Sequence, residues 1–140
     1  LDEELRRDGA SYSVLFLDLD RFKELNDRLG HEAGDAALRT LATIMREELR
    51  EQDIIGRFGG EEFVVALPGA DRSHATRVAE RIRARLQALA TEDPADAMRT
   101  VSIGAATLDD GETTSALLKR ADRAMYAAKA AGRNRVVHAH

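Results

Sequence analysis

The stretch IIGRFGGEEFVVAL, residues 54–67, decides the fold that we expect for this chain. Residues 54–58 and 62–67 are short apolar segments, each with the length of a β-strand. Gly59 and Gly60 stand between them, and glycine adopts positive φ without steric cost, which favours a tight hairpin. The two segments are therefore predicted to pair as antiparallel strands.

The segments on either side of the hairpin alternate between strand-like and helix-like patterns. Short apolar or β-branched runs predict strands, whereas apolar residues at spacings of three and four predict helices. Asp20 is in position to cap the first helix, and Gly30 to end it. The order β-α-α-β-β-α-β-α-β predicts an α+β fold, with a mixed central sheet flanked by helices in a palm-like arrangement. The other predicted strands are 12–18, 100–107 and 135–138, and the predicted helices are 21–29, 33–49, 72–89 and 115–131.

Composition excludes several classes of protein. The 140 residues carry a net charge of −4, which argues against a partner that is a nucleic-acid polymer bound through many phosphates. Cysteine is absent, so disulfides, thiolate metal sites and cysteine nucleophiles are excluded. The longest apolar runs, 63–67 and 124–128, are far shorter than the ~20 residues of a membrane span, and the charged start lacks the apolar core of a signal peptide. We expect one domain over residues 1–140, without membrane contact and, since it begins with Leu1, cut from a longer protein.

Two pairs of carboxylates stand beside predicted turns. Asp18 and Asp20 lie at the end of the first strand, and Glu61 and Glu62 follow the two glycines of the hairpin. If these strands are neighbours, the acids converge at one edge of the sheet, where their mutual repulsion favours a bound cation. Oxygen ligands without histidine or cysteine suit Mg²⁺ or Mn²⁺. The alternative is that Asp20 only caps a helix and that the glutamates decorate an exposed turn.

Four separated motifs cover most of the chain: FLDLDRFKELNDRLGHEAGD (16–35), RFGGEEF (57–63), VSIGAA (101–106) and LLKRADRAMYAAKAAGRN (117–134). In this order they resemble the GGDEF-domain diguanylate cyclases, with the hairpin in the GGEEF form. The resemblance implies the GGDEF fold and an enzyme that joins two GTP molecules into cyclic di-GMP and releases two pyrophosphates. It also implies a second copy of the domain that holds the second GTP, an upstream sensor or regulatory domain in a multidomain signalling protein, and a cytoplasmic location, where GTP is found.

The resemblance assigns the acidic residues to metal binding and catalysis. Asp18, the backbone carbonyl of Leu19 and Glu61 would hold Mg²⁺ or Mn²⁺. Glu61 or Glu62 would assist deprotonation of the attacking ribose 3′-hydroxyl, and the resemblance does not divide that role between them. Lys23 would contact phosphate and stabilise charge in the transition state; without the motif it would be taken for a solvated helix lysine.

The same resemblance implies a guanine site on the first two helices. Guanine presents two donors and an acceptor along one edge, which a carboxylate and a carboxamide complement. Asn26 and Asp35 match the guanine-contacting positions, and His31 between them would line the pocket or cap the turn after Gly30. Asp35 could equally serve as an acid near a helix N-terminus.

Further substrate contacts are implied around this site. Phe22 would pack under the nucleotide loop, or simply belong to the core. The bare backbone of Gly59 and Gly60 would let a ligand lie against it. Lys119 and Arg123 are four apart on one helix face and would hold the terminal phosphates, whereas composition alone favours an exposed basic face.

A second site is implied at RxxD, residues 50–53. Arg50 and Asp53 match the inhibitory product-binding site of the family, and Arg81 matches a supporting arginine. Arginine binds phosphate through two donors and lies flat on a purine, while aspartate accepts hydrogen bonds from the guanine edge. The alternative is a pair of solvated charges at a helix end.

Two other functions remain alternatives. A receptor could bind cyclic di-GMP at residues 50–53 and Arg81 without making it, although this chain keeps the glycines and acids that degenerate relatives often lose. A different palm-type nucleotidyl cyclase could use another base, because such folds share paired acids and metal chemistry. The family's DxLTGLxNR stretch, which helps to cover guanine, is absent from this sequence, and we expect catalysis to require assembly of two domains.

Overall fold

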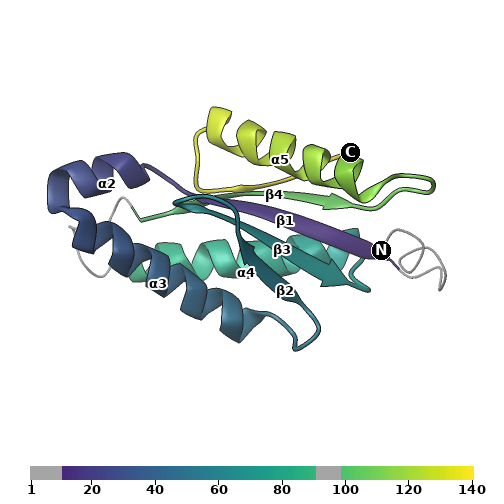
Figure 1. Ribbon diagram of the computed structural model, residues 1–140, viewed down its shortest axis with the longest axis horizontal. Helices are drawn as coiled ribbons and strands as arrows, with labels where there is room; N and C mark the ends of the chain where they lie inside the picture. The colour runs from purple at the N-terminus through teal and green to yellow at the C-terminus, as the bar shows by residue number, and fades with distance from the viewer. Residues whose placement is uncertain (1–10, 91–98) are drawn as a thin grey trace.

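The computed structural model describes residues 11–90 and 99–140, which form a five-stranded sheet with helices on both faces (Figure 1). The predicted order of strands and helices and the predicted fold class are confirmed. Along the chain the elements are β1 (Tyr12–Leu19), α2 (Phe22–Leu29), α3 (His31–Glu48), β2 (Ile54–Arg57), β3 (Glu62–Pro68), α4 (Arg72–Ala90), β4 (Val101–Thr107), α5 (Thr114–Ala130) and β5 (Val136–His138).

The sheet is mixed, and β1 lies at its centre. The strands follow the order β2-β3-β1-β4-β5. β1 is antiparallel to β3 and β4, β2 is antiparallel to β3, and β4 is parallel to β5. All residues of β1 are buried, as expected for a central strand. Because Asp18 pairs with Glu62, the C-terminal end of β1 lies beside the hairpin between β2 and β3.

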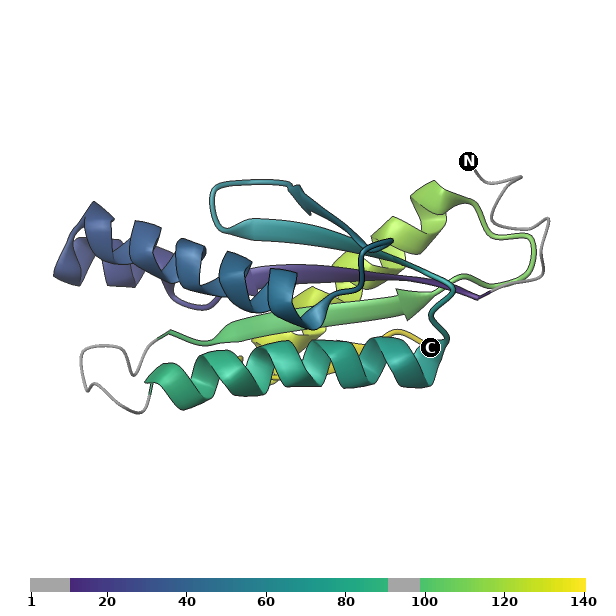
Figure 2. The ribbon, with the colours of Figure 1, turned by 90° about the horizontal axis from the view of Figure 1, so that it is seen from below.

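The two faces of the sheet have separate cores. On one face α3 and α4 lie side by side, and on the other face lies α5 (Figures 1 and 2). Since successive residues of a strand point to opposite faces, Leu17 joins the core under α3 and α4, whereas Phe16 joins the core under α5. α5 approaches the sheet most tightly at Gly104, where a Cβ atom would lie only 2.1 Å from the backbone nitrogen of Met125. A side chain at this position would push α5 off the sheet.

Two details of the local prediction are wrong. Asp20 does not cap α2: the N-cap residue is Arg21, which has no side-chain cap, and the Asp20 carboxylate is buried. The Asp20 N–H instead donates to the Thr100 carbonyl at 2.8 Å and so extends the pairing of β1 with β4. The hairpin forms as predicted, but neither Gly59 nor Gly60 has a positive φ. Backbone conformation therefore does not explain why these two residues are glycines.

The helix ends agree with the prediction to within two residues. Gly30, with a φ of 89°, ends α2 as predicted, because its backbone adopts a conformation that other residues avoid. α3 starts at His31, two residues before its predicted start. Among the described residues, no helix combines the length and the apolar character that crossing a bilayer would require.

Candidate functional site

The acids at the end of β1 and the start of β3 meet at one edge of the sheet, which we call the acidic edge (Asp18, Glu61 and Glu62). Asp18 is the register partner of Glu62, and the Leu19 N–H donates to the Glu61 carbonyl at 3.2 Å. Cross-strand partners share one face of a sheet, so Asp18 and Glu62 both point to the side of α5. This register brings Asp18 beside the hairpin glutamates, as predicted, whereas the Asp20 carboxylate does not join them, because its oxygens accept from Thr100, Ser102 and Asn134.

Burial makes the Asp18 carboxyl group harder to ionise. Its side chain is 8% exposed, and burial raises its pKa from 3.8 to about 6. Lys129 Nζ lies 3.0 Å from Asp18 Oδ1 and lowers this pKa, whereas the charges of Glu61 and Glu62 raise it. The acidic edge carries more negative charge than one lysine balances, which favours a further cation.

The oxygen atoms at the acidic edge are suitable ligands for a hard divalent cation. Asp18 Oδ1 is buried, and its partner among the described residues is the Lys129 ammonium group at 3.0 Å. Within residues 11–90 and 99–140, no three acidic or histidine side chains converge tightly enough to hold a metal by themselves. Mg²⁺ usually takes only one or two carboxylates and completes its shell with water and substrate phosphates. Asp18, the Leu19 carbonyl and Glu61 are a suitable partial ligand set of this kind for Mg²⁺ or Mn²⁺.

Lys129, which contacts the acidic edge through Asp18, was not singled out by the sequence analysis. The C-terminal turn of α5 carries it, and this turn lies beside the end of β1. Lys119 lies ten residues earlier in α5, about 15 Å along the axis, and Arg123 lies six residues earlier, about 9 Å. Both of these side chains are exposed. The structure thus brings Lys129 to Asp18, whereas phosphate binding by Lys119 and Arg123 stays a prediction.

Asn26 and Gly34 pack against each other where α2 meets α3. Asn26 Oδ1 is buried and has no hydrogen-bond partner among the described residues. A Cβ atom at Gly34 would lie 1.9 Å from Asn26 Oδ1 and 3.0 Å from the ring of Phe22, which itself packs against the larger core. Gly34, which the sequence analysis did not single out, therefore makes room for the amide. A buried amide oxygen without a donor is costly unless a ligand supplies one.

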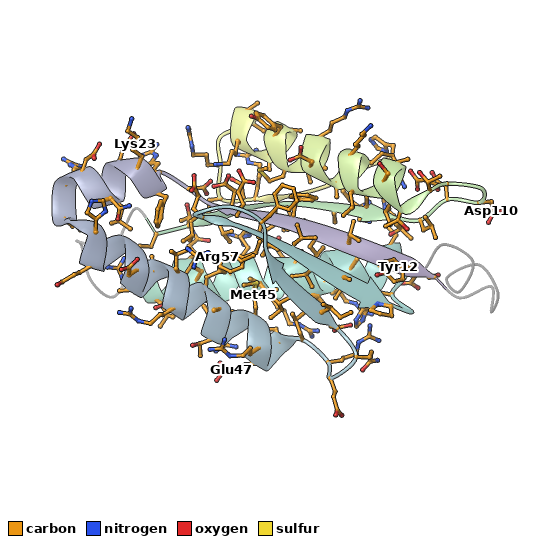
Figure 3. The ribbon with its side chains drawn as sticks, in the orientation of Figure 1. Tyr12, Lys23, Met45, Glu47, Arg57 and Asp110 are labelled. Carbon is orange, nitrogen blue, oxygen red and sulfur yellow. The ribbon has the colours of Figure 1, made fainter. Side chains whose placement is uncertain are left out.

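The other predicted substrate residues of α2 and α3 have exposed side chains. His31 is the first residue of α3, and Asp35 follows one turn later. Lys23 lies on α2, at the end of the molecule opposite to Asp110 (Figure 3). These three side chains are available to a ligand that reaches the buried amide of Asn26.

The hairpin leaves open backbone next to the acidic edge. A Cβ atom at Gly60 would meet nothing within 4 Å, and one at Gly59 would make only ordinary contact with Glu62. Arg57 braces the turn, since its guanidinium donates to the carbonyls of Gly59 at 3.3 Å and Gly60 at 2.6 Å. Neither φ nor packing demands glycine here, so the missing side chains are consistent with room for a ligand against the backbone.

Arg50 and Asp53 of the predicted second site contact each other just after the end of α3. Arg50 is bound to Asp53 through its backbone N–H at 2.8 Å and its guanidinium at 3.0 Å, and the Asp53 side chain is only 1% exposed. The buried Asp53 carboxylate does not fit the alternative that Arg50 and Asp53 are a pair of solvated charges. Arg81 of α4 pairs with Glu48 at 3.2 Å, and Glu48 also pairs with Arg85 at 3.1 Å. Both arginines of the predicted product site are thus engaged by carboxylates of this chain.

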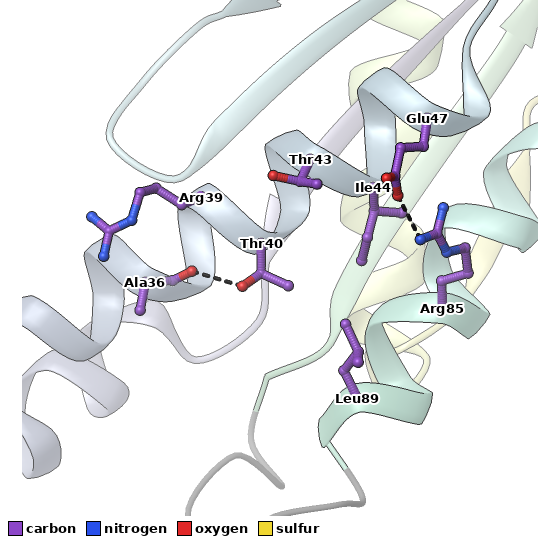
Figure 4. Close-up of a pocket in the computed structure, with 8 residues that line it drawn as sticks. All are labelled: Ala36, Arg39, Thr40, Thr43, Ile44, Glu47, Arg85 and Leu89. Carbon is purple, nitrogen blue, oxygen red and sulfur yellow. Dashed lines mark hydrogen bonds and ion pairs between the residues drawn. The ribbon is translucent and has the colours of Figure 1, made fainter.

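A cavity of about 430 Å³ lies between α3 and α4 (Figure 4). The Glu47–Arg85 ion pair at 2.7 Å lies on its wall, and the Thr40 hydroxyl there donates to the Ala36 carbonyl at 2.9 Å. None of the predicted site residues lines this cavity, so it is separate from the candidate site. Its lining residues are Ala36, Arg39, Thr40, Thr43, Ile44, Glu47, Arg85 and Leu89.

Comparisons with known proteins agree with the fold and the motifs. Residues 1–135 match the family described as "Diguanylate cyclase, GGDEF domain". The chain is 41% identical over 131 residues to the diguanylate cyclase DgcP of Pseudomonas aeruginosa, covering 93% of this chain and 20% of DgcP. It is 44% identical over 133 residues to the response regulator PleD of Caulobacter vibrioides, covering 92% of this chain and 29% of PleD. It therefore spans less than a third of the length of these relatives.

The fold also matches solved structures. The GGDEF domain of DgcB from Caulobacter crescentus, in complex with c-di-GMP, superimposes with a TM-score of 0.88 at 32% identity, over 98% of this chain and 82% of that chain. The family match covers nearly the whole sequence, and the identity to both curated relatives exceeds 40%. The chain belongs to the GGDEF-domain family of diguanylate cyclases.

Proposed function

We propose that this domain condenses two GTP molecules into cyclic di-GMP with release of two pyrophosphates, in a reaction that depends on Mg²⁺ or Mn²⁺. The observation that carries the proposal is the register that sets Asp18 opposite Glu62, with Glu61 and the Leu19 backbone beside them. The activity of relatives such as DgcP, named a diguanylate cyclase, supports it.

The acidic edge would supply the groups for phosphoryl transfer. Asp18, the Leu19 carbonyl and Glu61 would hold the metal, which when bound neutralises phosphate charge and favours ionisation of the attacking hydroxyl. Glu61 or Glu62 takes the proton of the ribose 3′-hydroxyl that attacks the α-phosphorus of the opposing GTP. A new P–O bond forms as the bond to the pyrophosphate breaks, and repetition with the roles exchanged closes the ring.

Cations beside the acidic edge would stabilise the phosphates. Lys129 is held by Asp18 at 3.0 Å, and neutralisation of Asp18 by a metal would release it to donate to the triphosphate. Lys23 on α2 donates to phosphate from the other side. Arg123, six residues before Lys129, would be a more distant contact, since about 9 Å of helix separates the two.

Guanine recognition would combine the buried amide and the exposed carboxylate of the first two helices. Asn26 Oδ1, which is buried and unpaired among the described residues, accepts from a guanine donor. Asp35 accepts from the N1–H and N2–H groups, which adenine lacks, so GTP is favoured over ATP. Phe22 supports the Asn26 amide, and His31 lines the same side of the pocket.

Catalysis would require two domains, because one domain holds one GTP and the attacking hydroxyl belongs to the other. An upstream regulatory domain would control this assembly in a longer multidomain protein; this chain matches 20% of the length of DgcP and 29% of the length of PleD. Product would bind at Arg50, Asp53 and Arg81 and inhibit; the DgcB domain, described in complex with c-di-GMP, supports an affinity of the fold for this product. A protein that consumes GTP in this way would work in the cytoplasm.

The direct test is incubation of the domain with GTP and Mg²⁺, both alone and fused to a dimeric coiled coil, followed by chromatography of the nucleotides. We expect cyclic di-GMP and pyrophosphate in a 1:2 ratio, and none from Asp18→Asn. Binding of GTP without product in the fused dimer would contradict the proposal. Binding of cyclic di-GMP without turnover would indicate a receptor, and a preference for ATP would overturn the base assignment.

A further inference from the structure

The side chain of Asp20 joins three segments behind the acidic edge. The residue is 2% exposed. Its Oδ1 accepts from the Ser102 hydroxyl at 2.6 Å, and its Oδ2 accepts from the Thr100 hydroxyl at 2.8 Å and from the Asn134 N–H at 2.9 Å. Thr100 and Ser102 lie at the start of β4, whereas Asn134 lies in the turn between α5 and β5. A buried carboxylate with three donors fixes the positions of the segments that it joins.

The turn that Asp20 holds has an unusual backbone. Arg133 and Asn134 have φ values of 66° and 47°, in the left-handed region that residues other than glycine rarely adopt. Such conformations persist only where the surroundings enforce them. Asn134 is also held from α4, since its side-chain oxygen accepts from Arg83 at 2.9 Å. Asp20 and Arg83 therefore fix this turn from two sides.

The position of the turn decides the position of Lys129. α5 ends one residue after Lys129, and the Gly132 N–H donates back to the Lys129 carbonyl at 3.3 Å. A shift of the turn would thus move the last turn of α5 relative to Asp18. On the β1 side Asp20 directly follows Leu19, so the same carboxylate also restrains the backbone carbonyl there.

We propose that Asp20 is a positioning residue, which aligns Lys129 and the Leu19 carbonyl with the acidic edge through its bonds to Ser102, Thr100 and Asn134. It touches neither substrate nor metal. The inference rests on the proposed function, because it assumes that Lys129 and Leu19 meet the triphosphate and its metal. It predicts that loss of the Asp20 carboxylate weakens the grip on phosphates and leaves the guanine site on α2 and α3 intact.

The test compares Asp20→Ala with Asp20→Asn. In the asparagine variant the amide oxygen still accepts from Thr100 and Asn134, and the amide N–H can donate to the Ser102 hydroxyl, so most of the alignment is retained. In the alanine variant the partly buried Asn134 N–H loses its acceptor. Affinities for a non-hydrolysable GTP analogue and for guanosine, which lacks phosphates, are measured by NMR titration. We expect Asp20→Ala to lose about 10- to 100-fold in affinity for the analogue and to keep the affinity for guanosine, and Asp20→Asn to rescue most of the loss.

Ser13→Ala is the matched control. Ser13 is a buried hydroxyl on β1 that donates to the Ala70 carbonyl at 2.8 Å and lies 2.8 Å from the Thr107 hydroxyl, at the opposite ends of β1 and β4. The Ser13→Ala substitution should lower the melting temperature without changing the ratio of the affinity for the GTP analogue to the affinity for guanosine. The inference would be overturned if Asp20→Ala kept the affinity ratio of the wild type. It would also be overturned if Ser13→Ala changed that ratio as Asp20→Ala does.

Two further outcomes also have a definite meaning: an Asp20→Ala variant that does not fold, and a wild-type domain that does not bind the analogue. If Asp20→Ala does not fold, Ser102→Ala removes one donor from the carboxylate and should still lower affinity for the analogue alone; equal losses for analogue and guanosine overturn the inference. A wild-type domain that does not bind the analogue contradicts the proposed function itself. Binding by the wild type with no effect of either variant contradicts only the role of Asp20.

Discussion

Gly34→Ala tests whether the contact between α2 and α3 serves guanine recognition. The new Cβ atom would lie 1.9 Å from Asn26 Oδ1 and 2.8 Å from its Cγ, so the amide must move by about 1.5 Å to restore the ordinary contact distance of 3.4 Å. The far end of a flexible side chain can make this movement by changing rotamer. The substitution therefore displaces the amide and leaves the backbone of α3 in place.

The expected effect on stability is small, whereas the expected effect on binding is large. Replacing a helix-interior glycine by alanine stabilises by about 1 kcal/mol, and a strained Asn26 rotamer costs about 0.5–1.5 kcal/mol, so the free energy of unfolding should change by less than about 1 kcal/mol. Loss of two hydrogen bonds to guanine at about 1 kcal/mol each corresponds to about 30-fold weaker GTP binding. Gly34→Ala should thus be folded and poorly able to bind GTP.

A double-mutant cycle with Asn26→Ala identifies the cause. Affinity for a non-hydrolysable GTP analogue is measured by calorimetry and stability by chemical denaturation, for both single variants and the double variant. If the methyl group of Gly34→Ala acts through the Asn26 amide, the double variant binds no more weakly than Asn26→Ala alone. Unchanged affinity in Gly34→Ala, or losses that simply add, would refute the reasoning.

Three further predictions concern the charges of the two sites. Because the pKa of Asp18 in the folded protein is about 6, above its ordinary value, Asp18→Asn should stabilise the metal-free protein at pH 8, by at most about 3 kcal/mol, since the substitution also removes the partner of Lys129. Chemical denaturation should show this gain fading as the pH falls through 6 towards 4, and a gain independent of pH would contradict the assignment. Glu48→Gln removes the carboxylate that pairs with Arg81 of the product site, and it should lower the concentration of cyclic di-GMP that half-inhibits turnover by up to about fivefold. Glu47→Gln removes only a partner of Arg85 and should leave that concentration unchanged. Lys129→Met should reduce turnover by about 100-fold, while Lys119→Met should leave it near the wild-type rate; the reverse ranking would restore the assignment of phosphate binding to Lys119.

The pattern of strands and helices was predictable because it depends on local periodicity. The apolar spacing in α3 and the continuous apolar run of β1 each identify one element without knowledge of the others. The two-residue shift at His31 reflects the usual difficulty of placing helix ends. The convergence of Asp18 with the hairpin was predictable only as a consequence of assuming that β1 and β3 are neighbours, and the register that pairs Asp18 with Glu62 is a property of the folded sheet.

The error at Asp20 and the omission of Lys129 arose where tertiary structure overrides a local signal. Asp20 precedes a helix and matches the preference for N-cap residues, but the pairing of β1 with β4 continues through its backbone and turns its side chain to Thr100 and Ser102. Lys119 and Lys129 are equally plausible as solvated helix lysines. Only the direction in which α5 crosses the sheet determines that the second lysine, and not the first, reaches Asp18.

The ion pair between Lys129 and Asp18 suggests how the acidic edge can fold before it meets a metal. Ionised Asp18 is costly to the folded protein, because its burial and, to a lesser degree, the charges of Glu61 and Glu62 raise its pKa. A divalent cation would relieve the cost more fully than one ammonium group, because it carries twice the charge and accepts several oxygen ligands at once. Binding of the metal would then weaken the hold of Asp18 on Lys129, and the lysine would turn to the negative charge that arrives with the metal, the triphosphate. On this argument the same lysine compensates the carboxylates in the free protein and the phosphates in the complex, so its contribution to turnover should exceed its contribution to folding.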